Sequence, residues 1–343
     1  SGYWWLDPSK KEVQDHSYSV VMDITKRYDI DGIHFDDYFY PYPSYNNDED
    51  FPDEESWKNY LNNGGDLSKA DWRRGNINVF IQRVYKGIKE IKPNVKFGLS
   101  PFGIWRPRHP ESIEGFDQYD KLYADAKLWI NEGWVDYWTP QLYWKISTIP
   151  QSFPVLLGWW KNENLKGRHF WPGINIDRDN NELNTMEVIN QIMTIRGMLP
   201  DSPGNLCWSV APILNYKELS DAIVNGPYKK QALVPRTPWF KNSPLGSPEI
   251  TTSKEIDKIK ISWTHENKNK VFRWVVYFKY GNRWDYVILD SDAFSYEVPL
   301  TSEYKFINDS DKEVIKKYEL NEVAVSAVDR ISNESIPTVR KID

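Results

Sequence analysis

The stretch Ile30-Asp31-Gly32-Ile33-His34-Phe35-Asp36-Asp37 decides how the first part of this chain folds. It follows a segment, residues 10–28, whose apolar positions repeat at helical spacing, and a second helical segment, 76–91, precedes the similar stretch 96–100. A strand that follows one helix and precedes another is the repeating unit of a parallel sheet with crossover helices. Residues 30–37 are therefore predicted to form a strand of such a sheet.

The same alternation continues to about residue 210. Three more strand-like stretches each follow a helical pattern, and they lie at 135–139, 170–175 and 206–210. This repetition predicts an α/β fold of the (β/α)8 TIM-barrel type, in which the carboxyl ends of the strands carry the active site. A doubly wound open sheet is the alternative, but no glycine-rich phosphate loop follows any of these strands, which favours the barrel.

The pattern changes after a proline-rich stretch at 233–248. Beyond it, short segments with a period of two predict an all-β sandwich of about 95 residues. With Trp263, Trp274 and the late segment 325–335, this part resembles a fibronectin type III domain. We therefore expect two domains, a barrel portion over 1–240 and a fibronectin III-like sandwich over 247–343.

Composition excludes several classes of function. The 343 residues carry 43 basic and 49 acidic side chains, a formal net charge of -6, so a nucleic-acid partner is not expected. The single cysteine, Cys207, and five scattered histidines show no metal-ligand spacing, and neither a metal nor another cofactor is predicted. Because no run of about 18 apolar residues occurs, no membrane span is predicted either.

The strand at 30–37 ends in two carboxylates surrounded by aromatic residues. Side chains alternate along a strand, so His34 and Asp36 share the face toward the barrel axis, with Asp36 at the carboxyl end. A pair of carboxyl groups and aromatic faces for sugar rings are what glycoside hydrolysis requires. We predict catalytic roles for Asp36 and Asp37. The predicted sugar contacts here are His34, Tyr38 and Tyr40.

The other strand ends combine aromatic and hydrogen-bonding side chains in the same way. If these ends meet at one rim, they form a polar, aromatic cleft that suits a carbohydrate. Asp177 is a further carboxylate in this set and is predicted to be catalytic. The remaining predicted sugar-binding residues are Trp105, Arg106, Gln141, Tyr143, Trp144, Asn175 and Trp208.

Three blocks, residues 31–43, 97–105 and 136–144, resemble glycosyl hydrolase-like family 10, a bacterial group of (β/α)8 proteins that are often secreted lipoproteins. The resemblance covers about residues 3–240. It implies a glycosidase acting on a polysaccharide or oligosaccharide, with some branches linked to peptidoglycan strands, and it implies that Asp36 is the nucleophile. It also implies a secreted or extracytoplasmic location, with lipid anchorage through an N-terminus upstream of residue 1.

The resemblance further implies that Trp5-Leu6-Asp7-Pro8 follows the third strand of the barrel. Five strands cannot close an eight-stranded barrel. We therefore expect the first three strands on a segment upstream of residue 1 or on another chain.

Three functions from different classes are weighed. The first is a glycoside hydrolase that cleaves a bacterial or dietary polysaccharide. The second is a carbohydrate-binding protein that has the cleft without turnover. The third is a metal-dependent carbohydrate enzyme, such as a deacetylase, using His34, Asp36 and Asp37; it is disfavoured because no second histidine has ligand spacing.

Overall fold

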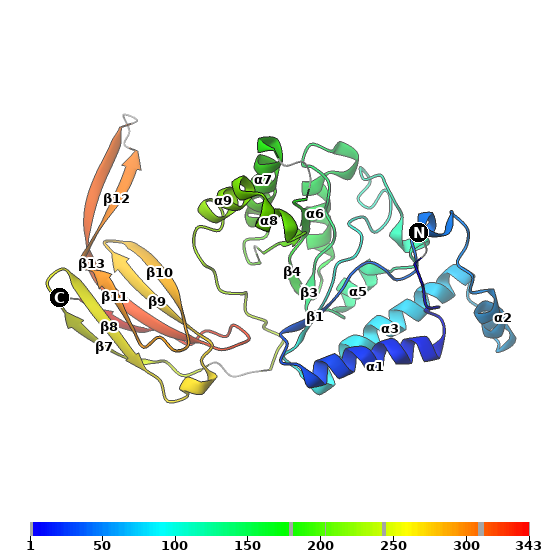
Figure 1. The fold of residues 1–343 in the computed structure, drawn as a ribbon, viewed down its shortest axis with the longest axis horizontal. Coiled ribbons are helices and arrows are strands. Elements are labelled where there is room, and N and C mark those ends of the chain that lie inside the picture. The colour runs from blue at the N-terminus through cyan, green and yellow to red at the C-terminus, as the bar shows by residue number, and fades with distance from the viewer. Residues whose placement is uncertain (1–2, 178–180, 203, 242–244, 308–311, 343) are drawn as a thin grey trace. The chain divides into compact units, whose positions relative to one another are not determined.

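The computed structural model describes residues 3–177, 181–202, 204–241, 245–307 and 312–342. The chain divides into two compact units, Ser1–Lys229 and Lys230–Asp343 (Figure 1). This boundary lies before the proline-rich stretch, because the chain already contacts the second unit there. Lys230 forms an ion pair with Asp285, and the Gln231 carbonyl accepts a hydrogen bond from Tyr286 Oη at 2.7 Å. The residues just before the predicted linker thus pack with the second unit.

The first unit is built on parallel strands that lie side by side in chain order, as consecutive strand–helix units produce. Four of them form one sheet: β1 (Gly32–Phe35), β2 (Lys96–Leu99), β3 (Tyr137–Trp138) and β4 (His169–Phe170). After β4 the chain continues into β5 (Gly173–Asn175), which pairs in parallel with β6 (Leu206–Trp208). Gln141 bridges to Phe102 and to Gly173, and so links the two sheets. Each of the five stretches predicted as strands contains one.

Helices connect these strands. Their bounds are α1 (Lys11–Arg27), α2 (Glu54–Asn62), α3 (Lys69–Ile91), α4 (Gln118–Lys121), α5 (Ala126–Glu132), α6 (Phe153–Glu163), α7 (Glu182–Met198), α8 (Ala211–Asn215) and α9 (Lys217–Asn225). The helical pattern that precedes the strand-like stretch 135–139 folds as two helices, α4 and α5. The first helix ends at Lys121, just before Tyr123, which has a left-handed φ of 52°. Asp125 caps the second helix, because its carboxylate accepts a hydrogen bond from Leu128 N. Figure 1 shows α1 and α3 lying side by side.

Four rings lie across the strands of the first unit and form a ring ladder in the order His34, Tyr137, Trp171, His169. Their centroids are 5.7, 5.4 and 4.8 Å apart. The ladder depends on Gly98 of β2, because a Cβ there would lie 2.1 Å from the Tyr137 ring. Glycine thus lets a side chain of β3 lie over β2 and reach β1.

The second unit consists of antiparallel strands in two sheets. One sheet has the order β10-β9-β13-β12 with β14 also on β13, and the other has the order β11-β8-β7. The bounds are β7 (Glu249–Lys254), β8 (Lys258–Thr264), β9 (Arg273–Tyr280), β10 (Arg283–Asp290), β11 (Ser295–Pro299), β12 (Thr301–Ile307), β13 (Glu313–Val328) and β14 (Thr338–Lys341). Trp263, Trp274 and Ile261 are buried in its core. The fibronectin III kinship stays a prediction.

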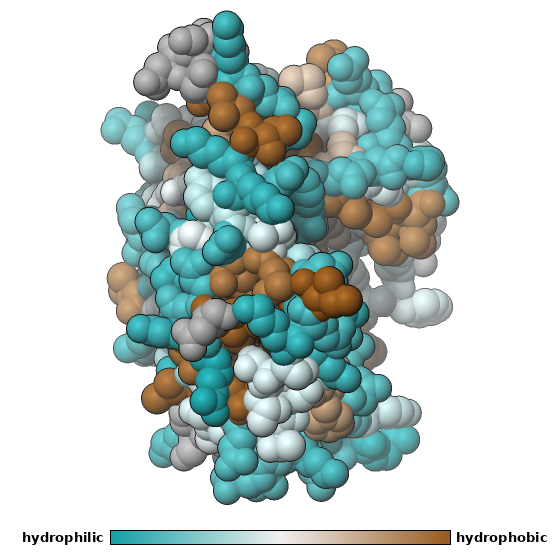
Figure 2. Space-filling view, turned by 90° about the vertical axis from the view of Figure 1, so that its left-hand side faces the viewer, coloured by the Kyte–Doolittle hydropathy of each residue, from teal (hydrophilic) through white to brown (hydrophobic). Residues whose placement is uncertain are grey.

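The side of the molecule that carries the second unit has a mixed surface. Figure 2 shows hydrophilic residues around separate hydrophobic groups, with no single apolar face. The β12–β13 ribbon contributes exposed Ile307 and Ile315. Separate exposed apolar side chains of this kind are ordinary for a folded protein and indicate no binding site by themselves.

Candidate active site

Asp36 follows β1 directly, and its exposed carboxylate is held by two donors. Gln141 Nε2 donates to Asp36 Oδ1 at 2.8 Å, and the backbone N–H of Asp37 donates to the same oxygen at 2.9 Å. Gln141 Nε2 also donates to the Ser100 carbonyl at 2.9 Å, so both of its N–H groups are engaged. Gln141, predicted to bind sugar, lies beyond the end of β3 and orients the Asp36 side chain.

Asp37 has a different environment. Its side chain is 3% exposed and accepts a hydrogen bond from the Tyr42 hydroxyl. Burial raises the pKa of Asp37 to about 6, and the charge of Asp36 adds to this effect while the Tyr42 hydrogen bond opposes it. Two adjacent carboxyl groups in different environments, one exposed and one buried, are an arrangement suited to acid–base chemistry.

Tyr143 and Trp208 lie beside this pair. The two rings are 5.9 Å apart and tilted by 33°, and Trp208 is exposed at the end of β6. Burial raises the pKa of Tyr143, and the negative charges of Asp36 and Asp37 raise it further, which places its hydroxyl near both. These residues offer a ring face and polar edges next to the carboxylates.

Asp177, the third predicted catalytic carboxylate, is exposed beyond the end of β5. Its backbone N–H donates to Asn175 Oδ1 at 2.8 Å, and Ser209 Oγ donates to Asp177 Oδ2 at 3.4 Å. Among the described residues no hydrogen bond joins it to Asp36 or Asp37. The structure thus groups Asp177 with Asn175 and the end of β6.

A cavity of about 500 Å³ opens beside Asp36. Its lining includes Asp36, Tyr38 and Trp5, together with apolar side chains such as Phe35 and Phe80. Trp5 is a residue that the sequence analysis did not assign to the site. The only available signal was its position in the aromatic N-terminal segment.

Comparison with known proteins identifies the group to which this site belongs. The family model described as Glycosyl hydrolase-like 10 matches residues 2–185, a range that contains Asp36, Asp37, Gln141 and Tyr143. The chain belongs to the glycosyl hydrolase-like 10 family. The resemblance noted in the sequence is therefore confirmed.

Two relatives in the comparison carry names that agree with the glycosyl hydrolase-like 10 family. Glycosyl hydrolase YngK of Bacillus subtilis (strain 168) is 32% identical over 351 residues, which cover 96% of this chain and 66% of that protein. Glycosyl hydrolase DigH of Escherichia coli (strain K12) is 42% identical over 159 residues, 45% of this chain and 35% of that protein. The chain thus spans about two thirds of the first relative and about a third of the second.

Burial corrects one predicted sugar contact, Tyr40, and four others have partners within the protein, although His34 also lines the cavity beside Asp36. Tyr40 is 1% exposed and packs with Arg73 in the core, so it presents no ring face to a ligand. Arg106 is engaged by Asp117 and Asp120. Three further side chains contact other rings: Trp105 stacks on Trp159 at 6.0 Å, Trp144 meets Phe102 edge-on at 5.5 Å, and His34 belongs to the ring ladder.

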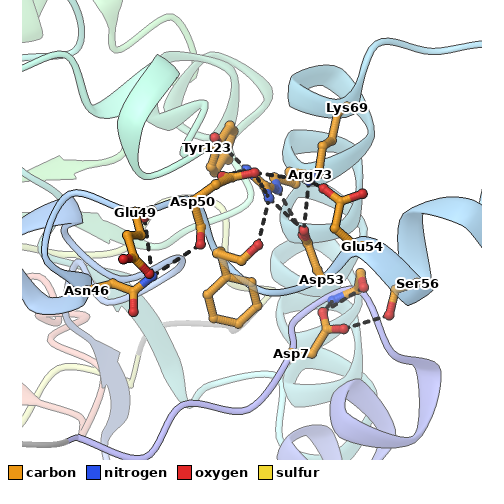
Figure 3. Close-up of polar contacts among 12 residues, drawn as sticks. Asp7, Asn46, Glu49, Asp50, Asp53, Glu54, Ser56, Lys69, Arg73 and Tyr123 are labelled. Atoms are coloured by element: carbon orange, nitrogen blue, oxygen red, sulfur yellow. Dashed lines mark hydrogen bonds and ion pairs between the residues drawn. The ribbon is translucent and has the colours of Figure 1, made fainter.

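A buried ionic cluster fixes the loop that follows Asp37 (Figure 3). Arg73 of α3 is 2% exposed and donates to both carboxylate oxygens of Asp53, at 2.8 and 2.6 Å. It also donates to Asp50 at 2.7 Å and to Tyr123 Oη at 2.6 Å, and Lys69 donates to Asp50 at 3.0 Å. Nothing in the residue spacing pointed to this cluster, which holds residues 50–53 against α3.

The described residues show neither a metal centre nor a membrane-spanning helix. Within the described ranges, His, Cys, Asp and Glu side chains do not gather in threes in a way that would hold a metal ion. None of the described helices has the length and apolar character needed to cross a membrane. His34, considered as a metal ligand, instead has its Nδ1 3.1 Å from Tyr137 Oη.

Proposed function

We propose that this protein is a glycosidase that cleaves a polysaccharide, with the glycan strands of bacterial peptidoglycan as the favoured class. The observation that carries the proposal is the Asp36–Asp37 pair, whose two carboxyl groups have opposite environments at the end of β1. Membership of the glycosyl hydrolase-like 10 family supports it.

The reaction needs one ionised carboxylate and one carboxylic acid. Asp36 is exposed, oriented by Gln141, and takes the first role, attacking the anomeric carbon or activating a water. Two side chains qualify as the acid that protonates the leaving oxygen. Asp37 keeps its proton up to about pH 6, and Asp177 has the exposure that contact with a substrate requires.

Tyr143 and Trp208 are proposed to hold the sugar. Burial raises the pKa of Tyr143, and its hydroxyl is close enough to Asp36 and Asp37 for their charges to raise this pKa further. Trp208, which is 47% exposed, lies 5.9 Å from the Tyr143 ring. An aromatic face covers the apolar side of a sugar ring and excludes water from the reacting bond.

We propose that the parallel strands form part of a (β/α)8 barrel. Among the described strands, β1 pairs only with β2 and β6 only with β5, so both outer edges have free hydrogen-bonding groups. Further strands, on an upstream segment or another chain, would pair at these edges. The apolar part of the cavity beside β1, including Val13, Ile77 and Phe80, suits the side chains of such a strand.

A cell-wall substrate places the proposed site of action outside the cytoplasm. Secretion, with or without a lipid anchor, is therefore part of the proposal. Fractionation of the native cells, with the protein detected in the envelope or medium, would support it, and recovery in the cytosol alone would contradict it.

The experiment compares Asp36→Asn, Asp37→Asn and Asp177→Asn with the parent on purified glycan strands and on aryl glycosides. Asp36→Asn is expected to lose at least about a hundredfold in kcat on every substrate, because the ionised carboxylate is required throughout. The acid variant is expected to lose activity on glycan while retaining much of it on aryl glycosides with good leaving groups. Asp221→Asn, an exposed change on α9, is the control.

Activity of Asp36→Asn within a few fold of the parent would rule out the assignment. Glycan binding by the parent without any product would instead indicate the second function, a carbohydrate-binding protein. The burial of Asp37 and the lack of a hydrogen bond between Asp177 and Asp36 among the described residues are what keep this alternative open.

A further inference from the structure

Four aromatic side chains gather beside the carboxyl pair. They come from the N-terminal segment and from the loop after β1, which includes the short helix η1 (Pro43–Asn46). We call this set the aromatic strip: Tyr3, Trp5, Tyr38 and Tyr45. In Figure 1 the N-terminal segment lies next to η1, although the two are about 40 residues apart in sequence.

The strip is held together by ring contacts. Tyr3 and Tyr45 have centroids 5.4 Å apart, and Trp5 meets Tyr38 edge-on at 6.3 Å. Trp5 Nε1 donates to the Phe39 carbonyl at 3.3 Å, which ties the N-terminal segment to the loop. The two segments therefore present one surface.

The strip is continuous with the carboxyl groups. Tyr45 packs on Tyr42 at 5.7 Å, and Tyr42 donates its hydroxyl hydrogen bond to Asp37. Burial raises the pKa of Tyr38, and the nearby Asp37 and Tyr45 add to this. Trp5, Tyr38 and Asp36 also line one cavity. A ligand chain that leaves Asp36 in this direction meets the strip next.

Three of the four rings are highly exposed for such large side chains, while Trp5 is half-buried. Tyr3 is 71% exposed, Tyr38 55% and Tyr45 48%. Isolated exposed aromatics are common, but a contiguous set marks a binding surface. Because three of the four are tyrosines, three of the ring faces have a hydroxyl at their edge. That pairing of a flat apolar face with a hydrogen-bonding rim matches a sugar ring, whose C–H groups and hydroxyls are arranged in the same way.

We propose that the aromatic strip forms accessory subsites that bind sugar units of a polymeric glycan at a distance from the bond that is cleaved. The ligand class is therefore a chain of several sugars, and a disaccharide reaches only Asp36 and its immediate neighbours. This inference rests on the proposed glycosidase function and adds the length of the substrate to it.

The test measures how affinity depends on chain length. Oligomers of two, four and eight sugars, prepared from bacterial peptidoglycan glycan, are titrated by calorimetry into Asp36→Asn, which prevents turnover. The same titrations are made with Tyr3→Ala and Tyr45→Ala added together, because these two rings of the strip do not line the cavity that contains Asp36. We expect affinity to rise at least about tenfold from the shortest to the longest oligomer, and the two alanines to reduce this rise to about twofold without weakening the disaccharide.

Two further variants sharpen the result. Tyr45→Phe is expected to retain the length dependence, because the ring face remains. Tyr28→Ala removes an exposed tyrosine at the opposite end of β1, just after α1, and is expected to change nothing. Circular dichroism of each variant shows whether the fold is kept.

The outcomes separate the inference from the proposed function. The inference is wrong if affinity still rises with oligomer length in the double alanine variant, or if affinity does not rise with length in Asp36→Asn alone. If the parent hydrolyses glycan in either case, the glycosidase proposal stands. If no oligomer binds and no glycan is cleaved, both proposals fail.

Discussion

Asp36 and Asp37 are neighbours in sequence, yet their side chains meet opposite surroundings. One is exposed and accepts hydrogen bonds from N–H groups, and the other is buried with the Tyr42 hydroxyl as its partner. Both residues follow the last residue of β1, Phe35, and the chain bends at Asp37, whose side chain meets the Tyr42 hydroxyl. The ionisation of the buried residue must therefore affect the stability of the fold.

The change Asp37→Asn tests this at the scale of one residue. The folded-state pKa of about 6 lies above the ordinary value of 3.8, so the folded parent binds more protons than the unfolded chain between these pH values. Its free energy of unfolding then falls as pH rises through this window. Asparagine at position 37 does not titrate, so the variant does not become less stable as pH rises through this window. Its free energy of unfolding relative to the parent is expected to increase by up to about 3 kcal/mol from pH 4 to pH 7.5.

Urea unfolding at the two pH values measures the effect. Asp23→Asn is the control, because the hydrogen bond from Arg27 lowers the pKa of Asp23 below its ordinary value of 3.8, so the effect of this change is expected to be nearly the same at pH 4 and pH 7.5. An Asp37→Asn difference that is the same at both pH values would contradict the burial argument.

Sequence reasoning reached part of this site. The period of two placed Asp36 at a strand end, and the structure agrees. The burial of Tyr40 was not predictable, because it depends on Arg73, which lies 33 positions later and carries a charge that is ordinarily exposed. Whether an aromatic residue in a loop is exposed depends on packing between segments that are distant in sequence. A local sequence pattern therefore does not predict its exposure.

At the scale of elements, the ionic cluster joins the loop after β1 to α3. Arg73 and Asp53 are both buried, so each charge relies on the other. Asp53→Asn leaves the Arg73 guanidinium partly unpaired and is expected to cost about 3–5 kcal/mol of unfolding free energy. Asp15→Asn, which removes exposed ion pairs with Lys11 of α1 and Arg83 of α3, is expected to cost much less.

Chemical denaturation of both variants gives the comparison. The double change Asp53→Leu with Arg73→Met removes both charges and is expected to cost less than Asp53→Asn alone, since no buried charge is left without a partner. Equal losses for Asp53→Asn and Asp15→Asn would show that the cluster does not hold the loop.

The ring ladder provides a second prediction for elements. Gly98→Ala places a methyl group against the Tyr137 ring, and we expect a loss of about 1–3 kcal/mol from this overpacking. Gly75→Ala in α3 meets nothing within 4 Å and is expected to stabilise the helix by about 0.5–1 kcal/mol. Thermal unfolding of the two variants should therefore shift in opposite directions, and a shared direction would contradict the role assigned to Gly98.

Elements with a buried face were predictable, and those without one were missed. The strands of the first unit and the long helices carry clear apolar periods. The helix α2 buries none of its residues, and β7 buries only Ile250, so neither has a hydrophobic period to detect. Their existence depends on neighbours that the local sequence does not specify.

At the scale of the whole molecule, each of the two units has a core of its own. Ile261 is fully buried in the second unit and Leu156 in the first. Each change to alanine is expected to cost about 2–5 kcal/mol within its own unit. Differential scanning calorimetry should resolve two transitions, with Ile261→Ala lowering one and Leu156→Ala the other. A joint shift would show that the chain unfolds as one unit.

The number of domains followed from the change of period near residue 240, because a shift from helical to strand spacing is a global property of the sequence. The exact boundary did not. It depends on Lys230 and Gln231 contacting Asp285 and Tyr286, which are brought near only when the second unit has folded.

The fit between Gly98 and Tyr137 also bears on how this family can diverge. A Cβ at position 98 and a ring at position 137 exclude each other, so a lineage that replaces the glycine first must pass through a destabilised ancestor. Replacing Tyr137 by a smaller residue before Gly98 changes avoids this destabilised intermediate. Descent therefore imposes an order on the two substitutions, and the two positions are expected to vary together, although they lie 39 residues apart in the chain.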